Sequence, residues 1–267
     1  MKPYTALLRI RFIHTLQYRA AALAGMATQF GFGYMFISQY LAFYRSNPSA
    51  FPMEVSQIVS YIWIQQAFIA LYFTWFFEAD IFTAITHGHI AYDLTRPISL
   101  YGKWVCQCLA GRLSRAVLRC FPILIVAMAL PDPYKLLLPP NALHFALFIV
   151  SSLLALGVVI TFSMLIYILT FYTMSPVGCR IISAILADFM AGSIVPLPFF
   201  PDGFRRIAEL LPFAAMQNIP LRIYSGHIAG AHAFYSILFQ LAWLVVLGAG
   251  GLIWMQKTLK RVIVQGG

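Results

Sequence analysis

Four long stretches without Asp, Glu, Lys or Arg constrain this chain most: Ala20–Tyr44, Val55–Phe77, Leu136–Cys179 and Ile223–Gln256. The hydrocarbon core of a bilayer is about 30 Å thick, so a helix needs roughly 20 apolar residues to cross it. Only 10% of the residues are charged and 61% are hydrophobic. A soluble domain of this composition would expose more apolar surface than it can bury. The sequence therefore predicts an all-α integral membrane protein, because helices satisfy their own backbone hydrogen bonds in lipid.

Six transmembrane helices are expected if each crossing takes about 20 residues. They fall over Ala20–Phe43, Gln57–Phe77, Leu109–Leu130, Leu143–Tyr172, Ile181–Leu197 and Phe234–Trp254. The third is the least regular, because Arg112, Arg115 and Arg119 lie in its first half. Their i, i+3, i+7 spacing places them on one helical face, which suits the inner interface or contact with protein. Residues 1–267 are expected to form a single transmembrane domain.

The distribution of basic residues predicts the topology. With both termini in the cytoplasm, the Lys and Arg residues outside are Arg45, Lys135, Arg205, Arg206 and Arg222. The remaining 13 of the 18 Lys and Arg residues then lie inside, in agreement with the positive-inside rule. The net charge of +10 thus mostly reflects the orientation of the chain in the membrane. It is typical of a multi-pass protein of the plasma (inner) membrane. No soluble segment is long enough to form a basic face for nucleic acid.

Patterns for catalysis and for nucleotide or metal binding are missing. The pair Gly102–Lys103 has Pro97 at the position where a phosphate-binding loop requires a further glycine. The cysteines form no CxxC pair, and the one metal-ligand type at helical spacing from His87 or His89 is Asp93, four residues after His89. We expect no enzyme activity and no cofactor or metal bound by this chain. Uphill transport would draw its energy from a partner subunit or an ion gradient.

Asp188 is the acidic residue that falls well inside a predicted span. A charge in the hydrocarbon region is costly, which makes Asp188 a candidate for ion coupling or for binding a cationic substrate. The alternative is a structural pair with Arg180 or with an arginine of the third span. The candidate groups of a substrate path through the membrane are Gln29, Gln39, Gln65, Gln66 and Asp188.

The N-terminal segment, residues 1–19, mixes apolar and basic side chains. Leu8, Phe12 and Leu16 form an apolar stripe that predicts an interfacial helix, with its arginines facing anionic lipid or an acidic partner. Simple membrane anchoring is the alternative.

The inner loop, residues 80–97, is expected to hold a short helix that Asp80 caps and Gly88 ends. Ile81, Phe82 and Ile85 would form an apolar face on the cytoplasmic side, where the chain has no core to bury it. A groove on a partner protein would cover that face. The alternative is that the face lies on the inner leaflet.

The outer segment, residues 194–213, follows the fifth predicted helix. Pro196, Pro198 and Pro201 prevent a continuous helix, yet Phe199 and Phe200 keep the segment apolar. Non-helical backbone at membrane depth is tolerated only where protein or a cavity covers it, so the sequence predicts a re-entrant element or an outer lid. An amphipathic loop on the outer leaflet is the alternative.

Three motifs, in this order relative to six spans, carry a resemblance over essentially the whole chain. They are Gly88–Ile98, Ile194–Pro201 with Leu211–Phe213, and Asn218–Gly226. The chain resembles the permease subunits of ABC-2 type transporters, in the group whose permease carries no ATPase of its own. The resemblance implies a connector helix at residues 1–19, a coupling helix in the loop 80–97 that docks on a separate ATPase, and an outer re-entrant segment at 194–213.

The resemblance also implies roles for particular residues. Those expected to couple to the ATPase are Ile81, Phe82, Ile85, Thr86, His87, Gly88 and Arg96. Those expected at the outer gate are Pro196, Pro198, Phe199, Phe200 and Pro201. Two copies of the ATPase, which bind ATP and Mg²⁺, and a second permease, identical or homologous, complete the assembly within membrane lipid.

The expected function is export of a hydrophobic or amphiphilic compound, cationic drug-like compounds included, with ATP hydrolysed by the partner. The alternative within transport is an ion-gradient-driven carrier that uses Asp188. The sequence shows no two-fold internal repeat with paired broken helices, which many such carriers have. A membrane enzyme lacks a catalytic cluster here, and a role in assembly stays open.

Overall fold

The structure, a computed structural model, describes residues 2–17, 19–173 and 175–261, and this part of the chain is helical without a β-strand. Its long helices are α2 (Arg19–Ser46), α7 (Leu100–Ala129), α8 (Ala142–Thr173) and α13 (Ala231–Leu259). The shorter elements are α1 (Lys2–Leu16), η1 (Pro48–Ala50), α3 (Val55–Ala67), α4 (Ile69–Tyr72), α5 (Ala79–Thr86), α6 (Ile90–Leu94), α9 (Pro176–Met190), η2 (Leu197–Phe199), α10 (Asp202–Leu210), α11 (Pro212–Met216) and α12 (Asn218–Tyr224). The all-α expectation is confirmed.

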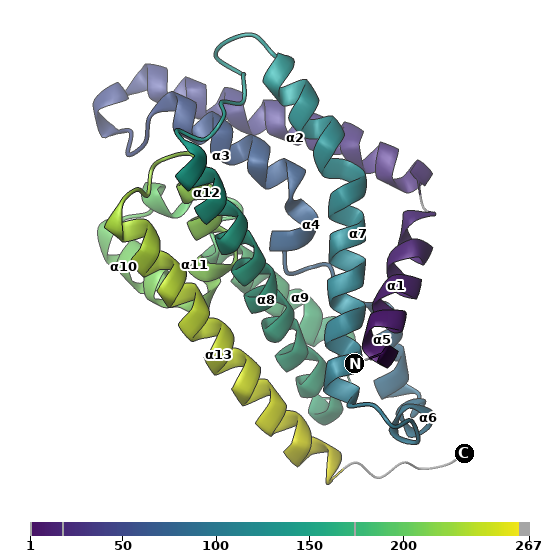
Figure 1. The fold of residues 1–267 in the computed structure, drawn as a ribbon. Helices are drawn as coiled ribbons and strands as arrows, with labels where there is room; N and C mark the ends of the chain where they lie inside the picture. Colours follow the sequence, from purple (N-terminus) through teal and green to yellow (C-terminus); the bar gives the residue numbers. More distant parts are fainter. Residues whose placement is uncertain (1, 18, 174, 262–267) are drawn as a thin grey trace.

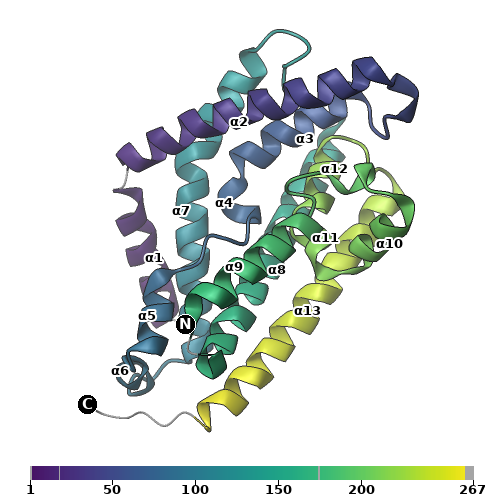
Figure 2. The same cartoon turned by 180° about the vertical axis from the view of Figure 1, so that it is seen from behind.

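The helices are arranged so that the molecule has two distinct ends. Helices α8 and α13 run side by side, α1 lies along the first half of α7, and α2 crosses α3 and α7 (Figure 1; Figure 2). Helices α5 and α6 and the last turn of α13 gather at one end of the molecule. The loops 47–54, 130–141 and 225–230 lie toward the opposite end.

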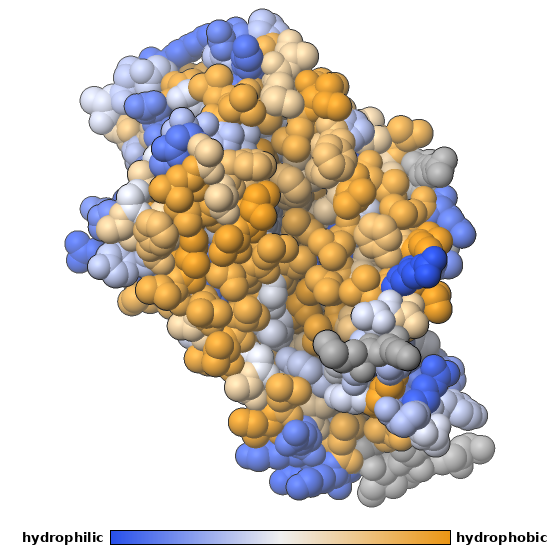
Figure 3. Space-filling view, viewed as in Figure 1, coloured by the Kyte–Doolittle hydropathy of each residue, from blue (hydrophilic) through white to orange (hydrophobic). Residues whose placement is uncertain are grey.

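The surface of the molecule supports a membrane location. Two of the described helices, α8 and α13, are both long enough and apolar enough to cross a bilayer. Figure 3 shows a broad hydrophobic surface on one face, with hydrophilic residues concentrated toward the margins of that face. Large apolar side chains that face outward include Leu153 on α8 and Leu238 and Val245 on α13. Lipid is the environment in which such a surface is stable.

The second predicted span is interrupted, and its expected extent to Phe77 is wrong. Helix α3 ends at Ala67, the single turn α4 ends at Tyr72, and the chain then runs without helix to Glu78. No proline or glycine explains the break. The side chain of Arg112 from α7 lies against this segment, is 0% exposed, and donates to the carbonyl oxygens of Ala70 (3.1 Å), Leu71 (3.4 Å), Phe73 (2.8 Å) and Phe76 (3.1 Å).

The third and fifth predicted spans also differ from the observed helices. Helix α7 begins at Leu100 rather than Leu109, because the Ser99 side chain caps it by accepting from the Gly102 N–H at 3.4 Å. Helix α9 stops at Met190 rather than Leu197, seven residues early. Gly192 then adopts a φ of 80°, a left-handed conformation that glycine adopts without strain.

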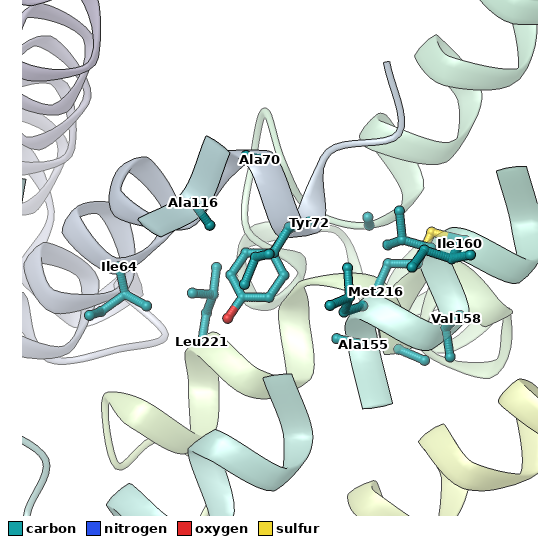
Figure 4. Close-up of a cluster of buried hydrophobic side chains, with 14 of the residues drawn as sticks. Ile64, Ala70, Tyr72, Ala116, Ala155, Val158, Ile160, Met216 and Leu221 are labelled. Carbon is teal, nitrogen blue, oxygen red and sulfur yellow. The ribbon is translucent and has the colours of Figure 1, made fainter. Parts of the chain in front are cut away.

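The core lies between α4, α7, α8 and the α11–α12 segment. Figure 4 shows Tyr72 of α4 near Ala155 of α8 and Met216 and Leu221 of the α11–α12 segment. The Tyr72 hydroxyl bonds the Ser152 Oγ of α8 at 2.9 Å, so the one polar atom of this ring is satisfied. Helices α11 and α12 are therefore part of the core, whereas α10 is largely exposed.

Candidate functional site

A cavity of about 470 Å³ lies between α2, the end of α3, the segment 73–76 and α9. We call it the central cavity. Its lining residues are Gly25, Thr28, Gln29, Phe32, Phe36, Gln66, Ile69, Phe73, Trp75, Phe76, Arg119, Ala184, Ile185, Asp188, Ser193 and Ile194. Phe32 and Ile194 at its wall are 51% and 57% exposed, so the cavity opens onto the surface of this chain. Mostly apolar walls with a few polar groups are typical of small-molecule sites.

The central cavity brings together Gln29, Gln66 and Asp188, three of the five residues expected along a substrate path. The Oε1 atoms of Gln29 and Gln66 are buried and have no hydrogen-bond partner in the described part of the chain. A buried acceptor without a donor is unfavourable. A ligand that supplies N–H or O–H donors would satisfy both oxygens.

Asp188 is 8% exposed and is held by Thr74 of the segment after α4. Its Oδ1 accepts from the Thr74 N–H at 2.9 Å and from the Thr74 hydroxyl at 3.0 Å. Among the described residues, no ion pair joins it to Arg180 or to an arginine of α7, and its hydrogen bonds go to Thr74 instead. Asp188 instead ties α9 to the broken second span.

Gln39 and Gln65 lie outside the central cavity. Gln39 is exposed on α2. Gln65 is 3% exposed, and its Nε2 donates to the Ser193 carbonyl oxygen at 2.8 Å. Gln65 therefore stabilises the turn after α9 and does not line the central cavity.

A buried polar network fixes the turn that follows α9. The Gly192 carbonyl oxygen accepts from the Tyr61 hydroxyl at 3.3 Å and from Gln217 Nε2 at 3.4 Å. The Ser193 hydroxyl donates to Gln217 Oε1 at 3.1 Å. Gln217 is 0% exposed and lies where α11 meets α12. The network satisfies backbone groups that a continuous helix would otherwise pair.

Two of the residues expected at the outer gate, Phe199 and Phe200, lie in two different aromatic clusters. The ring of Phe199 lies 4.9 Å from that of Tyr40 on α2 and 4.9 Å from that of Phe51, measured between centroids. The ring of Phe200 lies 5.1 Å from that of Phe204. Pro196 and Pro198 are buried and Pro201 is exposed. The structured segment continues past the expected limit at residue 213, through α11 and α12 to Tyr224.

The apolar face of α5 is buried inside the chain, which corrects the expectation that a partner protein or the inner leaflet would cover it. Ile81, Phe82 and Ile85 are 2%, 5% and 6% exposed. The Phe82 ring packs on Tyr167 of α8, with 4.8 Å between the ring centroids. The helix begins after Glu78 and not after Asp80, while Gly88 follows its end with a φ of 71°, as expected.

The outward surface of this inner loop consists of other residues. His87, Arg96 and Tyr92 are exposed, Tyr92 by 74%, and Thr86 and Gly88 are half-buried. Among the residues expected to couple to an ATPase, His87 and Arg96 are thus the ones freely accessible.

Helix α1 packs on α7, so its apolar stripe faces protein as well as the surface. Leu8, Phe12 and Leu16 are half-buried. The Tyr4 hydroxyl accepts from the Ser99 N–H at 3.0 Å at the start of α7. Arg11 Nη1 lies 2.9 Å from Asp80 Oδ2, an ion pair that joins α1 to α5.

A second cavity of about 470 Å³, formed by α10–α12 and the start of α13, was not anticipated from the sequence. Arg222 Nη1 lies 2.8 Å from Glu209 Oε1 at its wall. Burial, with the charges of Arg222 and Arg205, lowers the pKa of His227 from 6.5 to about 4. The motif Asn218–Gly226 was the available signal, because it contributes three of the lining residues.

In the part of the chain that the structure describes, no three His, Cys, Asp or Glu side chains gather as metal ligands would. The described residues form an all-helical membrane protein with interrupted helices around an open cavity. The sequence model of the family described as "ABC-2 family transporter protein" matches residues 40–265. The chain belongs to this family of transmembrane permease components of ABC transporters. No curated protein and no solved structure matches the chain.

Proposed function

We propose that this permease works in an ATP-driven exporter of hydrophobic or amphiphilic compounds. ATP and Mg²⁺ bind two copies of a separate ATPase, and a second permease, identical or homologous, completes the complex in the plasma (inner) membrane, which the chain crosses six times. The observation that carries the proposal is the central cavity. Its apolar walls suit a hydrophobic body, and its buried oxygens on Gln29 and Gln66 suit a few donor groups on that compound.

The open side of the central cavity supports the pairing of two permeases. Phe32 and Ile194 face outward at its wall, so a second permease packed on α2 and α9 would close the cavity. Substrate would then lie between the two subunits and leave past the segment 194–224. Movement of the ATPase would reach the spans through α5, which packs on α8, and through the Arg11–Asp80 pair.

The first experiment is a tagged pull-down from native membranes in mild detergent, followed by mass spectrometry. We expect a soluble nucleotide-binding protein, with or without a second permease. A stable lone protein with no ATPase in the eluate would contradict the ATP-driven mechanism.

The second candidate is an ion-gradient-driven carrier that uses Asp188, favoured by the position of that carboxylate at the wall of the central cavity. The two candidates separate in an efflux assay in whole cells. Export that stops when ATP is depleted but survives an ionophore supports the ATP-driven mechanism, and the reverse result supports the carrier.

Asp188→Asn tests whether the substrate is cationic. Asparagine retains an Oδ1 acceptor for both Thr74 donors, so we expect the protein to fold while losing the negative charge. Efflux of a cation such as tetraphenylphosphonium should fall about tenfold, the effect of removing one charge-assisted contact. Efflux of a neutral compound should change little. Equal loss for both compounds would assign Asp188 a structural role alone.

A further inference from the structure

A further cavity of about 310 Å³ lies between the second half of α1, the start of α2, the residue before α5, and the middle of α7. We call it the basic cavity. Its lining residues are Arg11, His14, Thr15, Ala22, Glu78, Gln107, Gly111, Arg115, Leu118 and Arg119. Gly111 makes room for the Glu78 carboxylate, which a Cβ on that residue would strike.

The basic cavity carries more positive than negative charge. Three guanidinium groups line it, from Arg11, Arg115 and Arg119, against the single carboxylate of Glu78. Glu78 Oε1 pairs with Arg115 Nη2 at 3.1 Å. Arg11 pairs at 2.9 Å with Asp80, which is 67% exposed and does not line the cavity. The balance within the cavity therefore favours an anion.

Arg115 offers a donor that the protein leaves unused. Its Nη1 is buried and has no hydrogen-bond partner among the described residues. A guanidinium presents its N–H groups as a fixed fork, which matches the oxygens of a phosphate group better than a single point charge does. A phosphate oxygen in the cavity would satisfy this donor and offset the excess positive charge.

The surroundings favour a lipid over a free phosphate ion. Leu118 and Ala22 lie among the lining residues. The neighbouring side chains of Leu23 on α2 and of Val117 and Phe121 on α7 are 63%, 44% and 62% exposed. These outward apolar groups give acyl chains a surface directly beside the basic cavity.

We propose that the basic cavity binds the phosphate group of an anionic phospholipid of the inner leaflet. The headgroup lies between α1 and α7, its phosphate contacts Arg11, Arg115 and Arg119, and its chains follow α2 and α7. The bound lipid joins α1 to the span that contacts the broken second helix. Arg119 lines both the basic cavity and the central cavity, and the proposed lipid contact does not depend on export of a substrate.

The experiment measures lipid retention by native mass spectrometry. The protein is released from nanodiscs that contain equal amounts of phosphatidylglycerol and phosphatidylcholine, and the ratio of the two lipids bound is recorded. We expect enrichment of phosphatidylglycerol in the unmodified protein. Arg11→Gln and Arg119→Gln should each reduce this enrichment about tenfold, since each removes a charge-assisted contact.

Two control variants separate the cavity from general charge. Arg9→Gln removes an exposed arginine of the same helix that does not line the cavity. Asp80→Asn breaks the ion pair with Arg11 and leaves the cavity lining intact. Both should retain phosphatidylglycerol as the unmodified protein does. If Arg9→Gln reduces the enrichment as much as Arg11→Gln, non-specific attraction explains the binding and the proposal is wrong.

A second measurement distinguishes lipid from free anion. The midpoint of thermal unfolding of delipidated protein is recorded in detergent with added phosphatidylglycerol, or with inorganic phosphate alone at the same concentration. We expect only the lipid to raise the midpoint, and Arg11→Gln to reduce that rise. Equal stabilisation by inorganic phosphate would overturn the lipid assignment, and this readout involves neither transport nor an ATPase. If Arg119→Gln does not fold, Arg11→Gln and its controls decide the question.

Discussion

Arg112 shows how one charged residue can be compatible with the interior of this protein. Its guanidinium is completely buried. Burial of a charged group is ordinarily unfavourable because the group loses its hydration. Here it donates to the carbonyl oxygens left unpaired where the second span loses its helix, with the shortest bond, 2.8 Å, to Phe73. The side chain and the broken backbone therefore compensate each other.

Arg112→Gln should destabilise the protein by about 3 kcal/mol or more, because hydrogen bonds to a charged group contribute roughly 1.5–3 kcal/mol each and the shorter amide cannot reach the same carbonyls. The measurement is the midpoint of thermal unfolding in detergent, together with the yield of monodisperse protein. Arg180→Gln, at an exposed position of α9, is the control and should change neither value. An unchanged midpoint for Arg112→Gln would show that the carbonyls do not depend on this residue.

His227 should make the stability depend on pH. Its pKa is about 4 in the folded chain and near 6.5 when unfolded, so the unfolded state binds more protons between these values. Stability contributed by His227 is therefore lost as pH falls from about 6.5 toward 4. The unfolding midpoint measured across this range should fall less in His227→Gln than in the unmodified protein. Parallel curves would contradict the assignment.

Helix α5 has one face buried in the core and one exposed face. Its amphipathic pattern alone does not show whether the apolar face packs inside the chain or against a partner. Ile81, Phe82 and Ile85 face α8 and the core, while Asp80 and Thr83 are exposed. The buried face makes α5 part of the same packed body as the spans. In the ATP-driven complex that we propose, an ATPase docked at this loop would contact the exposed side of α5 and the adjoining α6 rather than the apolar face.

Phe82→Ala should destabilise the protein by about 3–5 kcal/mol, because it removes a buried ring packed on Tyr167. Tyr92→Ala, at a side chain 74% exposed on α6, should leave the unfolding midpoint unchanged and weaken recovery of the ATPase in a pull-down. The unfolding midpoint and the recovery of the ATPase are measured for both variants. A stable Phe82→Ala protein that fails to bind the ATPase would restore the apolar face as the docking surface.

The molecule as a whole has two ends of different character. One end holds α5 and α6, and the other holds the loops 47–54 and 130–141 (Figure 1). In the first of these loops, Phe51 packs on the ring of Phe199. The central cavity lies between these two ends, and the exposed side chains of Phe32 and Ile194 stand at its opening. This difference between the two ends suits the proposed function, in which the ATPase binds at one face and substrate leaves at the other.

Cysteine labelling in cells tests this orientation. In a chain whose own cysteines are replaced by serine, Leu138→Cys, at a residue 73% exposed, should react with a membrane-impermeant maleimide from outside. His87→Cys, at the opposite end, should react only after the cells are permeabilised. The reverse pattern would invert the topology, and labelling of both from outside would place α5 on the outer side.

The local sequence was enough to predict the helical class and the end of α5 before Gly88, because apolar length and glycine act directly on the local backbone. The prolines predicted that the fifth span is followed by non-helical chain, but not that α9 already ends at Met190. The resemblance carried by three motifs predicted the family, which the match over residues 40–265 confirms. No local pattern predicted the break at Phe68 or the burial of Phe82. Nor did one predict that Gln29, Gln66 and Asp188 line one cavity without Gln39 or Gln65. They depend on contacts between segments far apart in the chain, such as Arg112 with Phe73 and Asp188 with Thr74. Only packing decides which polar group meets which partner, because the free energy of a buried polar group depends on the atoms that surround it.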